Sequence, residues 1–140
     1  MAIKFEAVVQ AIEQIAPKYL QESWDNSGIQ ISTGKLEIEK ILTTLELTDE
    51  IVEEAIREDI DLIVSHHPLI FGGIKSIDFH DPIGSMIVKL INAGICVYSS
   101  HTPFDKIEGG NNDYLAELIG LRDISGFTAG DEVEMIGRIG

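Results

Sequence analysis

Histidine and aspartate side chains can bind divalent metal ions, and three of the four histidines in the chain are grouped with one aspartate. They occur in two short segments, Ser65-His66-His67-Pro68 and Ser99-Ser100-His101-Thr102-Pro103-Phe104-Asp105. Imidazole nitrogen and carboxylate oxygen form a ligand set suited to zinc, iron, manganese, cobalt or nickel. The two segments are therefore candidates for the two halves of a metal site.

The spacing of His66 and His67 leaves the number of metal ions open. Adjacent residues in an extended chain point to opposite sides, and Pro68 favours an extended conformation at His67. The pair could serve two ions, or one ion if the chain turns sharply, and Asp105 could bridge two ions about 3.5 to 4 Å apart. In the competing interpretation, backbone carbonyl groups at the end of a strand satisfy both histidines.

Other notable side chains receive structural interpretations. We expect His101 to orient a neighbouring group or to form a loop hydrogen bond rather than to ligate directly. His80 precedes a helix cap and is expected on the surface. Cys96 lies between apolar residues of a buried strand, which favours a role in the core over that of a nucleophile. We expect Trp24 to be a packing anchor rather than a stacking platform.

The two histidine segments each follow a short apolar run, at 62–65 and 95–98, of the kind found in strands buried on both faces. Further strands are predicted at 29–31 and 41–47. Helical periodicity predicts four helices, of which the first ends near Pro17. The second begins at a cap formed by Thr48. The third begins at Asp81 and ends at Gly94, and the fourth begins at Asn111 or Asn112 and ends at Gly120. The alternation of strands and helices predicts an α/β fold with a mostly parallel sheet and helices on both faces.

This fold class also predicts where a ligand would bind. In open parallel sheets, ligands collect outside the carboxyl ends of the strands. Both histidine segments are expected at that edge, so the sequence brings three histidines and one carboxylate to the same place.

Composition limits the classes of protein to which the chain can belong. Its 140 residues suit one domain, and they carry 24 acidic against 10 basic side chains, for a formal charge of -14. The basic residues form no cluster, which disfavours nucleic-acid binding. The chain has no apolar run of membrane length and no signal-peptide pattern at its N-terminus, and it has a single cysteine. We therefore expect a soluble, cytoplasmic protein.

Three segments together resemble the Nif-three-like dinuclear-metal proteins, also named GTP cyclohydrolase 1 type 2 homologues. They are residues 24–28 (WDNSG), residues 61–71 (DLIVSHHPLIF), and HTPFD at 101–105 followed by GGNND at 109–113. The resemblance covers essentially all 140 residues, in the same order and at similar spacing. It implies an α/β fold, a two-metal site and a ring-shaped homohexamer. It also implies that His66, His67 and Asp105 are metal ligands and that His101 lies beside them.

The chain departs from the family pattern in a few places. Pro103 stands where the family commonly has Asn, Phe104 where Leu is usual, and Glu46 where Asp is frequent. Family members generally continue into a second half that supplies a late His and Glu to the metal shell. We expect this chain to correspond to the N-terminal half, as one α/β metal-binding domain over 1–140, and to bind metal weakly or as a single ion. Residues 133–136 look like the beginning of a strand.

The resemblance implies a metal-dependent hydrolase of the GTP cyclohydrolase type, in which a metal-activated water attacks a nucleotide or a phosphoester. His101 is the candidate catalytic residue, and either His101 or Glu46 could move protons. The alternative is a non-catalytic metal-binding assembly or adaptor module. The expected partners are further copies of the chain and a nucleotide substrate, whereas nucleic acid and membranes are disfavoured.

Overall fold

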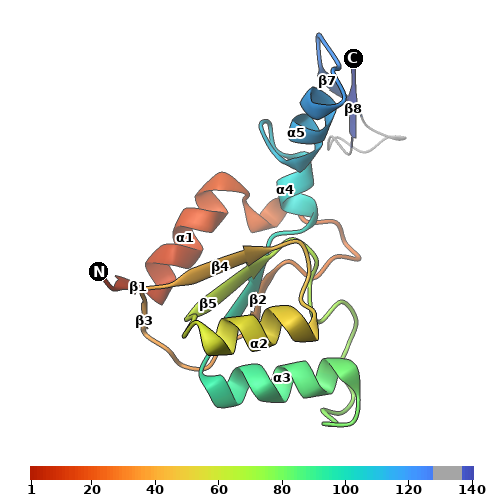
Figure 1. Ribbon diagram of the computed structural model, residues 1–140. Coiled ribbons are helices and arrows are strands. Elements are labelled where there is room, and N and C mark those ends of the chain that lie inside the picture. Colours follow the sequence, from red (N-terminus) through yellow and green to blue (C-terminus); the bar gives the residue numbers. More distant parts are fainter. Residues whose placement is uncertain (128–136) are drawn as a thin grey trace.

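A four-stranded β-sheet forms the centre of the molecule, whose computed structural model describes residues 1–127 and 137–140 (Figure 1). Its strands lie in the order β2-β6-β5-β4. Their bounds are Gly28–Ile31 for β2, Ile41–Thr44 for β4, Leu62–Ser65 for β5 and Cys96–Ser99 for β6. Strands β4, β5 and β6 are parallel, and β2 pairs with β6 in the antiparallel direction. The prediction of a mostly parallel α/β sheet is confirmed.

Helices cover both faces of this sheet (Figure 1). Helix α1 (Phe5–Ile15) packs on one face, where its apolar side chains form a core with those of β5 and β6. Helices α2 (Asp49–Arg57) and α3 (Pro82–Ala93) lie side by side on the other face and form a second core with the sheet. Cys96 is fully buried in the first core, as predicted. Because apolar side chains hold β5 and β6 from both sides, the ends of these two strands have a well-defined position.

The helix ends follow the capping residues that the sequence predicts. Thr48 accepts a hydrogen bond from the N–H of Ile51 through its side chain, and the Asp81 carboxylate accepts one from the N–H of Gly84. Gly94 ends α3 in the left-handed conformation, at a φ of 71°, which glycine adopts without steric cost. These caps confirm the predicted starts of α2 and α3.

Two boundary predictions are wrong for local reasons. The strand predicted over 41–47 ends at Thr44, whose hydroxyl donates a hydrogen bond to the carbonyl oxygen of Glu46 and so turns the chain out of the sheet. The cap of helix α5 (Asn111–Leu118) is Gly110, which has no side chain to offer, and neither asparagine forms a side-chain cap.

A C-terminal group of elements lies beyond the end of the sheet (Figure 1). It contains α5, a short helix α4 (Thr102–Lys106) that the sequence analysis did not predict, and the antiparallel strands β7 (Ser125–Phe127) and β8 (Gly137–Ile139). Arg138 on β8 pairs with Asp113 on α5 and also donates to the carbonyl oxygen of Ile107. These contacts attach β8 to α5.

The remaining elements are small. Strands β1 (Ile3–Lys4) and β3 (Glu37–Ile38) form an antiparallel pair, and a 3-10 turn, η1 (Lys18–Leu20), packs against α4. The strand predicted at 133–136 lies outside the described residues. Over 1–127 and 137–140, every helix is too short or too polar to cross a lipid bilayer.

Candidate metal centre

His66 and His67 directly follow β5, and backbone hydrogen bonds hold them there. The N–H of His66 donates to the carbonyl oxygen of Thr44 at 3.1 Å, and that of His67 donates to the carbonyl oxygen of Leu45 at 2.8 Å. The hydroxyl of Ser65 donates to the carbonyl oxygen of His67 at 2.8 Å. The two histidines are therefore fixed to the end of the sheet rather than carried by a free loop.

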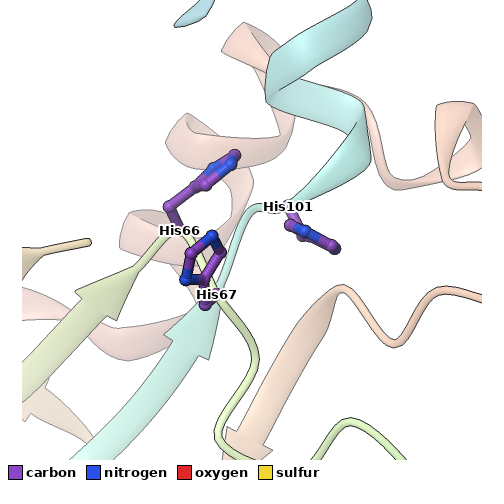
Figure 2. Close-up of side chains that lie close together, drawn as sticks. All are labelled: His66, His67 and His101. Carbon is purple, nitrogen blue, oxygen red and sulfur yellow. The ribbon is translucent and has the colours of Figure 1, made fainter. Parts of the chain in front are cut away.

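His101 comes to the same place from the neighbouring strand, two residues after the end of β6. Figure 2 shows the three imidazole rings gathered beyond the ends of the two adjacent strands. One ring nitrogen from each of His66, His67 and His101 lies within 4.8 Å of the other two. The parallel pairing of β5 with β6, in which Ser65 lies opposite Ser99, brings the segments together.

The adjacent histidines do not diverge as strand alternation would require. Strand β5 ends at Ser65, so the alternation does not continue through His66 and His67. Their ring centroids are 5.2 Å apart, and the distances from His101 are 5.2 Å to His66 and 5.7 Å to His67. The structure therefore has the turn that would let both histidines serve one small cluster.

Asp105 reaches the cluster from α4. Its Oδ1 atom lies 3.5 Å from Nε2 of His66, and the side-chain amide of Asn111 donates to the same oxygen at 3.2 Å. The side-chain amide of Asn112 donates to the backbone carbonyl oxygen of Asp105 at 3.0 Å. The two asparagines predicted as alternative helix caps instead hold the candidate ligand and its backbone.

One nitrogen of His66 contacts a backbone carbonyl, as the competing interpretation of the histidine pair proposed. Nδ1 of His66 lies 3.0 Å from the carbonyl oxygen of Ser100, which leaves Nε2 directed toward Asp105. A hydrogen bond from one ring nitrogen to a carbonyl group is the usual support for a histidine that ligates a metal through the other. The two interpretations are thus compatible for His66.

Asp25 is a member of the site that the sequence analysis did not single out. Its side chain is fully buried, and its Oδ1 atom lies 2.9 Å from Nδ1 of His101. The carboxylate also accepts hydrogen bonds from the hydroxyls of Ser27 and Thr102 and from the backbone N–H of Asn26. The signal was present, because Asp25 falls in one of the three segments that carry the family resemblance.

These hydrogen bonds determine the charge of Asp25. Burial acts to raise the pKa of the Asp25 carboxyl, but the hydrogen bonds from Thr102, His101, Ser27 and Asn26 outweigh it, so the pKa is lowered. An ionised carboxylate only accepts hydrogen bonds. Nδ1 of His101 must therefore carry the proton of this contact, and in the neutral imidazole Nε2 is then the unprotonated nitrogen.

Glu46 and Trp24 complete the surroundings of the cluster. Oε2 of Glu46 lies 3.5 Å from Nδ1 of His67, and both side chains are well exposed. Trp24 is 58% exposed, so the prediction that it is a packing anchor is wrong. Its ring centroid lies 6.0 Å from that of His101 and 6.1 Å from that of Phe71.

The donor atoms of the site are of the kinds that bind a metal ion. Three imidazole nitrogens lie close together, and a carboxylate oxygen of Asp105 lies 3.5 Å from His66 but does not belong to the mutually close set; imidazole and carboxylate match the ligand preference of zinc and of the neighbouring transition metals. The ligand roles of His66, His67 and Asp105 and the catalytic role of His101 stay predictions. His80, the fourth histidine, is exposed on the loop before α3, far along the chain from either histidine segment.

Comparison with known proteins places the chain among relatives with the same fold. The family model described as Duf34/NIF3 (NGG1p interacting factor 3) matches residues 3–140. A GTP cyclohydrolase 1 type 2 homolog from Bacillus subtilis (strain 168) is 36% identical over 122 residues, which are 87% of this chain and 33% of that protein. A protein of the same name from Staphylococcus epidermidis (strain RP62A) is 42% identical over 123 residues, or 88% of this chain and 33% of the relative.

Solved structures agree. A Bacillus cereus protein related to NIF3 superposes with a TM-score of 0.84 at 35% identity, covering 89% of this chain and 34% of that one. Reduced HcgD from Methanocaldococcus jannaschii superposes with a TM-score of 0.81 at 31% identity, covering 90% of this chain and 50% of that one. The chain thus spans between a third and a half of the length of these relatives.

Proposed function

Since the chain belongs to the Duf34/NIF3 family, we propose that it is a metal-dependent hydrolase that resembles GTP cyclohydrolase 1 type 2 and acts on a nucleotide or a phosphoester. The convergence of ring nitrogens from His66, His67 and His101 within 4.8 Å carries this proposal. The names of the most similar curated relatives give it a reaction class.

Each member of the cluster has a role in this proposal. His66, His67 and Asp105 would hold up to two divalent ions of the zinc, iron, manganese, cobalt or nickel type. Such an ion lowers the pKa of a bound water toward neutrality, which supplies a nucleophile. His101, whose Nδ1–H is engaged by Asp25, presents Nε2 as the atom that accepts or returns a proton. Glu46 lies 3.5 Å from His67 and is a second candidate for moving protons.

The charge of the molecule limits how a nucleotide could bind. A formal charge of -14 repels a triphosphate, so a nucleotide substrate requires local positive charge at the site. Metal ions at the cluster supply that charge. Activity should therefore depend on metal both for the reaction and for substrate binding.

A metal titration tests the proposal most directly. We expect wild-type protein, stripped with chelator and then titrated with zinc or manganese, to bind at least one ion per chain. His66→Ala and Asp105→Ala should lower the stoichiometry or weaken binding at least tenfold. His80→Ala, which changes an exposed histidine outside the cluster, is the matched control. Equal stoichiometry and affinity in all four proteins would remove the proposed site.

Turnover of GTP and of a phosphodiester by the same preparations tests the reaction class. Hydrolysis should disappear with chelator, return with the metal, and fall strongly in His101→Ala. If stripped and reloaded protein react at the same rate, the hydrolase proposal fails.

A specific observation favours the second candidate, a metal-binding assembly module that forms homo-oligomers up to a hexamer. The loop before α3 exposes four large apolar side chains, those of Phe71, Ile74, Ile77 and Phe79. Contiguous exposed apolar surface commonly marks a protein-protein interface. Light scattering with and without metal separates the two candidates, because an oligomer that binds no metal and is indifferent to it favours assembly. We also propose a reducing, cytoplasmic setting, which the single, buried, free Cys96 suits.

A further inference from the structure

A hollow of about 440 Å³ lies next to the candidate metal centre. Its lining comes from the segment before β2 and from helices α4 and α5, and consists of Glu22, Ser23, Trp24, Thr102, Asp105, Lys106 and Asn112. Asp105 belongs to both places, since its Oδ1 atom lies 3.5 Å from Nε2 of His66. A molecule in the hollow would therefore touch the residue that connects it to the histidine cluster. The volume falls in the range of small-molecule sites.

Trp24 gives this hollow an aromatic wall. The ring is tilted against Phe71 and edge-on to His101, and neither of these two residues lines the hollow. Trp24 thus lines the hollow while it contacts Phe71 and His101, and 58% of the residue is exposed. An exposed indole beside a cavity is a surface on which flat rings stack.

The charges of the lining disfavour a phosphate group there. The ammonium of Lys106 lies 2.8 Å from Oε1 of Glu22, and both side chains are largely buried. Asp105 adds a second carboxylate to the lining. The local charge of these three groups is negative, and an anion would have to displace the Lys106–Glu22 pair or overcome the carboxylates.

Polar atoms around the hollow can bind the edge of an uncharged ring. The Nδ2 group of Asn112 donates to the backbone of Asp105, which leaves the amide oxygen of Asn112 as an acceptor. The hydroxyl of Ser23, an exposed residue, is both a donor and an acceptor. The opening therefore offers hydrogen bonds in both directions to a ligand that stacks on Trp24.

We infer that this hollow binds the flat, uncharged nitrogen heterocycle of the substrate, a purine-like base stacked on Trp24, and that it excludes the phosphates. The inference rests on the proposed function for the identity of the ligand as a substrate. It adds the part of the substrate that the chain recognises and the place where recognition occurs. Phosphates, where present, are then directed toward the metal centre.

Trp24 is the single tryptophan of the chain, so its fluorescence reports on this site alone. We expect inosine, an uncharged purine nucleoside, to quench this fluorescence saturably. The quenching should be the same in metal-loaded protein and in the presence of chelator. Ribose and inorganic tripolyphosphate should neither quench nor compete. Quenching that does not saturate, or that tripolyphosphate abolishes, overturns the inference.

Substitutions test the role of the indole, with inosine binding measured by equilibrium dialysis. Trp24→Ala should weaken binding about tenfold or more, because stacking on an aromatic side chain is lost, and Trp24→Phe should recover most of it. Tyr114→Ala is the matched control, since Tyr114 is an aromatic residue of similar exposure, 60%, on α5 that does not line the hollow. Unchanged binding in Trp24→Ala, or an equal loss in Tyr114→Ala, contradicts the inference.

The outcomes also separate this inference from the proposed function. Inosine binding without metal-dependent hydrolysis leaves the heterocycle site in place and removes the hydrolase. Hydrolysis of a phosphodiester without inosine binding leaves the hydrolase in place and removes the heterocycle site.

Discussion

At the scale of single residues, the least obvious contribution to the site is that of Asp25. This carboxylate contacts His101 and also accepts hydrogen bonds from its two sequence neighbours Asn26 and Ser27 and from Thr102 on α4. Its contact with the histidine cluster is the one to Nδ1 of His101. We therefore regard it as a positioning residue, which holds the imidazole and selects the nitrogen that faces the cluster.

We predict that Asp25→Asn lowers the metal-dependent turnover about 10- to 100-fold with little change in metal affinity, because the group that orients His101 is lost. The amide group of the new asparagine puts a donor where the carboxylate has an acceptor, so one hydroxyl or N–H group around position 25 loses its partner. This loss should lower the unfolding free energy by about 1 to 3 kcal/mol. Hydrolysis assays, with calorimetric metal titration beside them, and chemical denaturation measure these effects. Glu117→Gln, the same chemical change at an exposed position of α5, is the control. Wild-type turnover in Asp25→Asn would show that His101 needs no such support.

A second carboxylate, Asp61, makes stability depend on pH. It binds the ammonium of Lys35 and accepts backbone hydrogen bonds from Glu39 at 2.7 Å and Lys40 at 3.0 Å. Burial acts to raise the pKa of Asp61, but these hydrogen bonds outweigh it, so the pKa is lowered from its ordinary value of 3.8. The group thus stays ionised in the folded protein at pH values where the unfolded chain binds a proton.

The sign of the effect follows from this difference. The stabilisation is complete above the ordinary pKa of 3.8 and is lost as the pH falls through the lower pKa of the folded state. We predict that the unfolding free energy of the wild type decreases below about pH 4. Asp61→Asn should already be less stable at neutral pH, and its unfolding free energy should decrease less steeply with falling pH. Urea denaturation at several pH values measures both slopes. Identical slopes for the two proteins would contradict the assignment.

At the scale of secondary-structure elements, α4 is decisive because it delivers Asp105. Its connection to α5 is tight at Gly110. A Cβ atom at this glycine would lie 2.1 Å from the carbonyl oxygen of Phe104, which is backbone and cannot move without shifting α4. The neighbouring Gly109 has a φ of 72° but open space around it.

These two glycines provide a matched pair of substitutions. Gly109→Ala should cost about 1 to 2 kcal/mol of unfolding free energy, the strain of a left-handed alanine, with little effect on metal binding. Gly110→Ala should lower the unfolding free energy by more than Gly109→Ala does. It should also weaken metal binding, because α4 and Asp105 are displaced. Denaturation and metal titration of both variants test this. Equal effects of the two substitutions on metal affinity would show that α4 does not position the ligand.

At the scale of the whole molecule, metal binding and folding should be coupled. The candidate ligands come from the segment that follows β5 and from α4, which come together only in the folded chain. An ion that binds the folded state alone stabilises it by about 2.7 kcal/mol at a concentration one hundred times its dissociation constant.

We therefore predict that zinc or manganese raises the midpoint of thermal unfolding in a concentration-dependent manner. Magnesium and calcium should do so much less, because they prefer oxygen ligands and the cluster is rich in imidazole. His66→Ala should lose most of the shift, whereas His80→Ala should keep it. A shift of equal size with magnesium, or in His66→Ala, would argue for nonspecific binding to the acidic surface.

Much of the architecture could be predicted from the sequence because local patterns carry it. The caps at Thr48 and Asp81 and the end of α3 at Gly94 follow from side-chain and backbone chemistry within a few residues. The apolar runs that became β5 and β6 identified the strands, and their order indicated a parallel sheet. From these elements it followed that both histidine segments lie at one edge.

Short-range patterns failed where a distant partner decides the outcome. The predicted strand over 41–47 ended at Thr44, and the expected asparagine caps of α5 bind Asp105 instead. Helix α4 was not predicted, since its five residues carry no periodic signal of their own. Trp24 was expected to be a packing anchor, but it is 58% exposed.

The residue types of the site, the strands that precede them and the family to which they point were thus determined by the sequence alone, because composition and periodicity are properties of neighbouring residues. Three things required the tertiary structure: the distances between the histidine side chains at their shared edge, the contact of Asp25 with His101 across 76 positions of the chain, and the hollow beside Trp24. Each depends on the distance between segments that are remote in sequence. Such distances are set by the packing of helices on the sheet, and no local pattern encodes them.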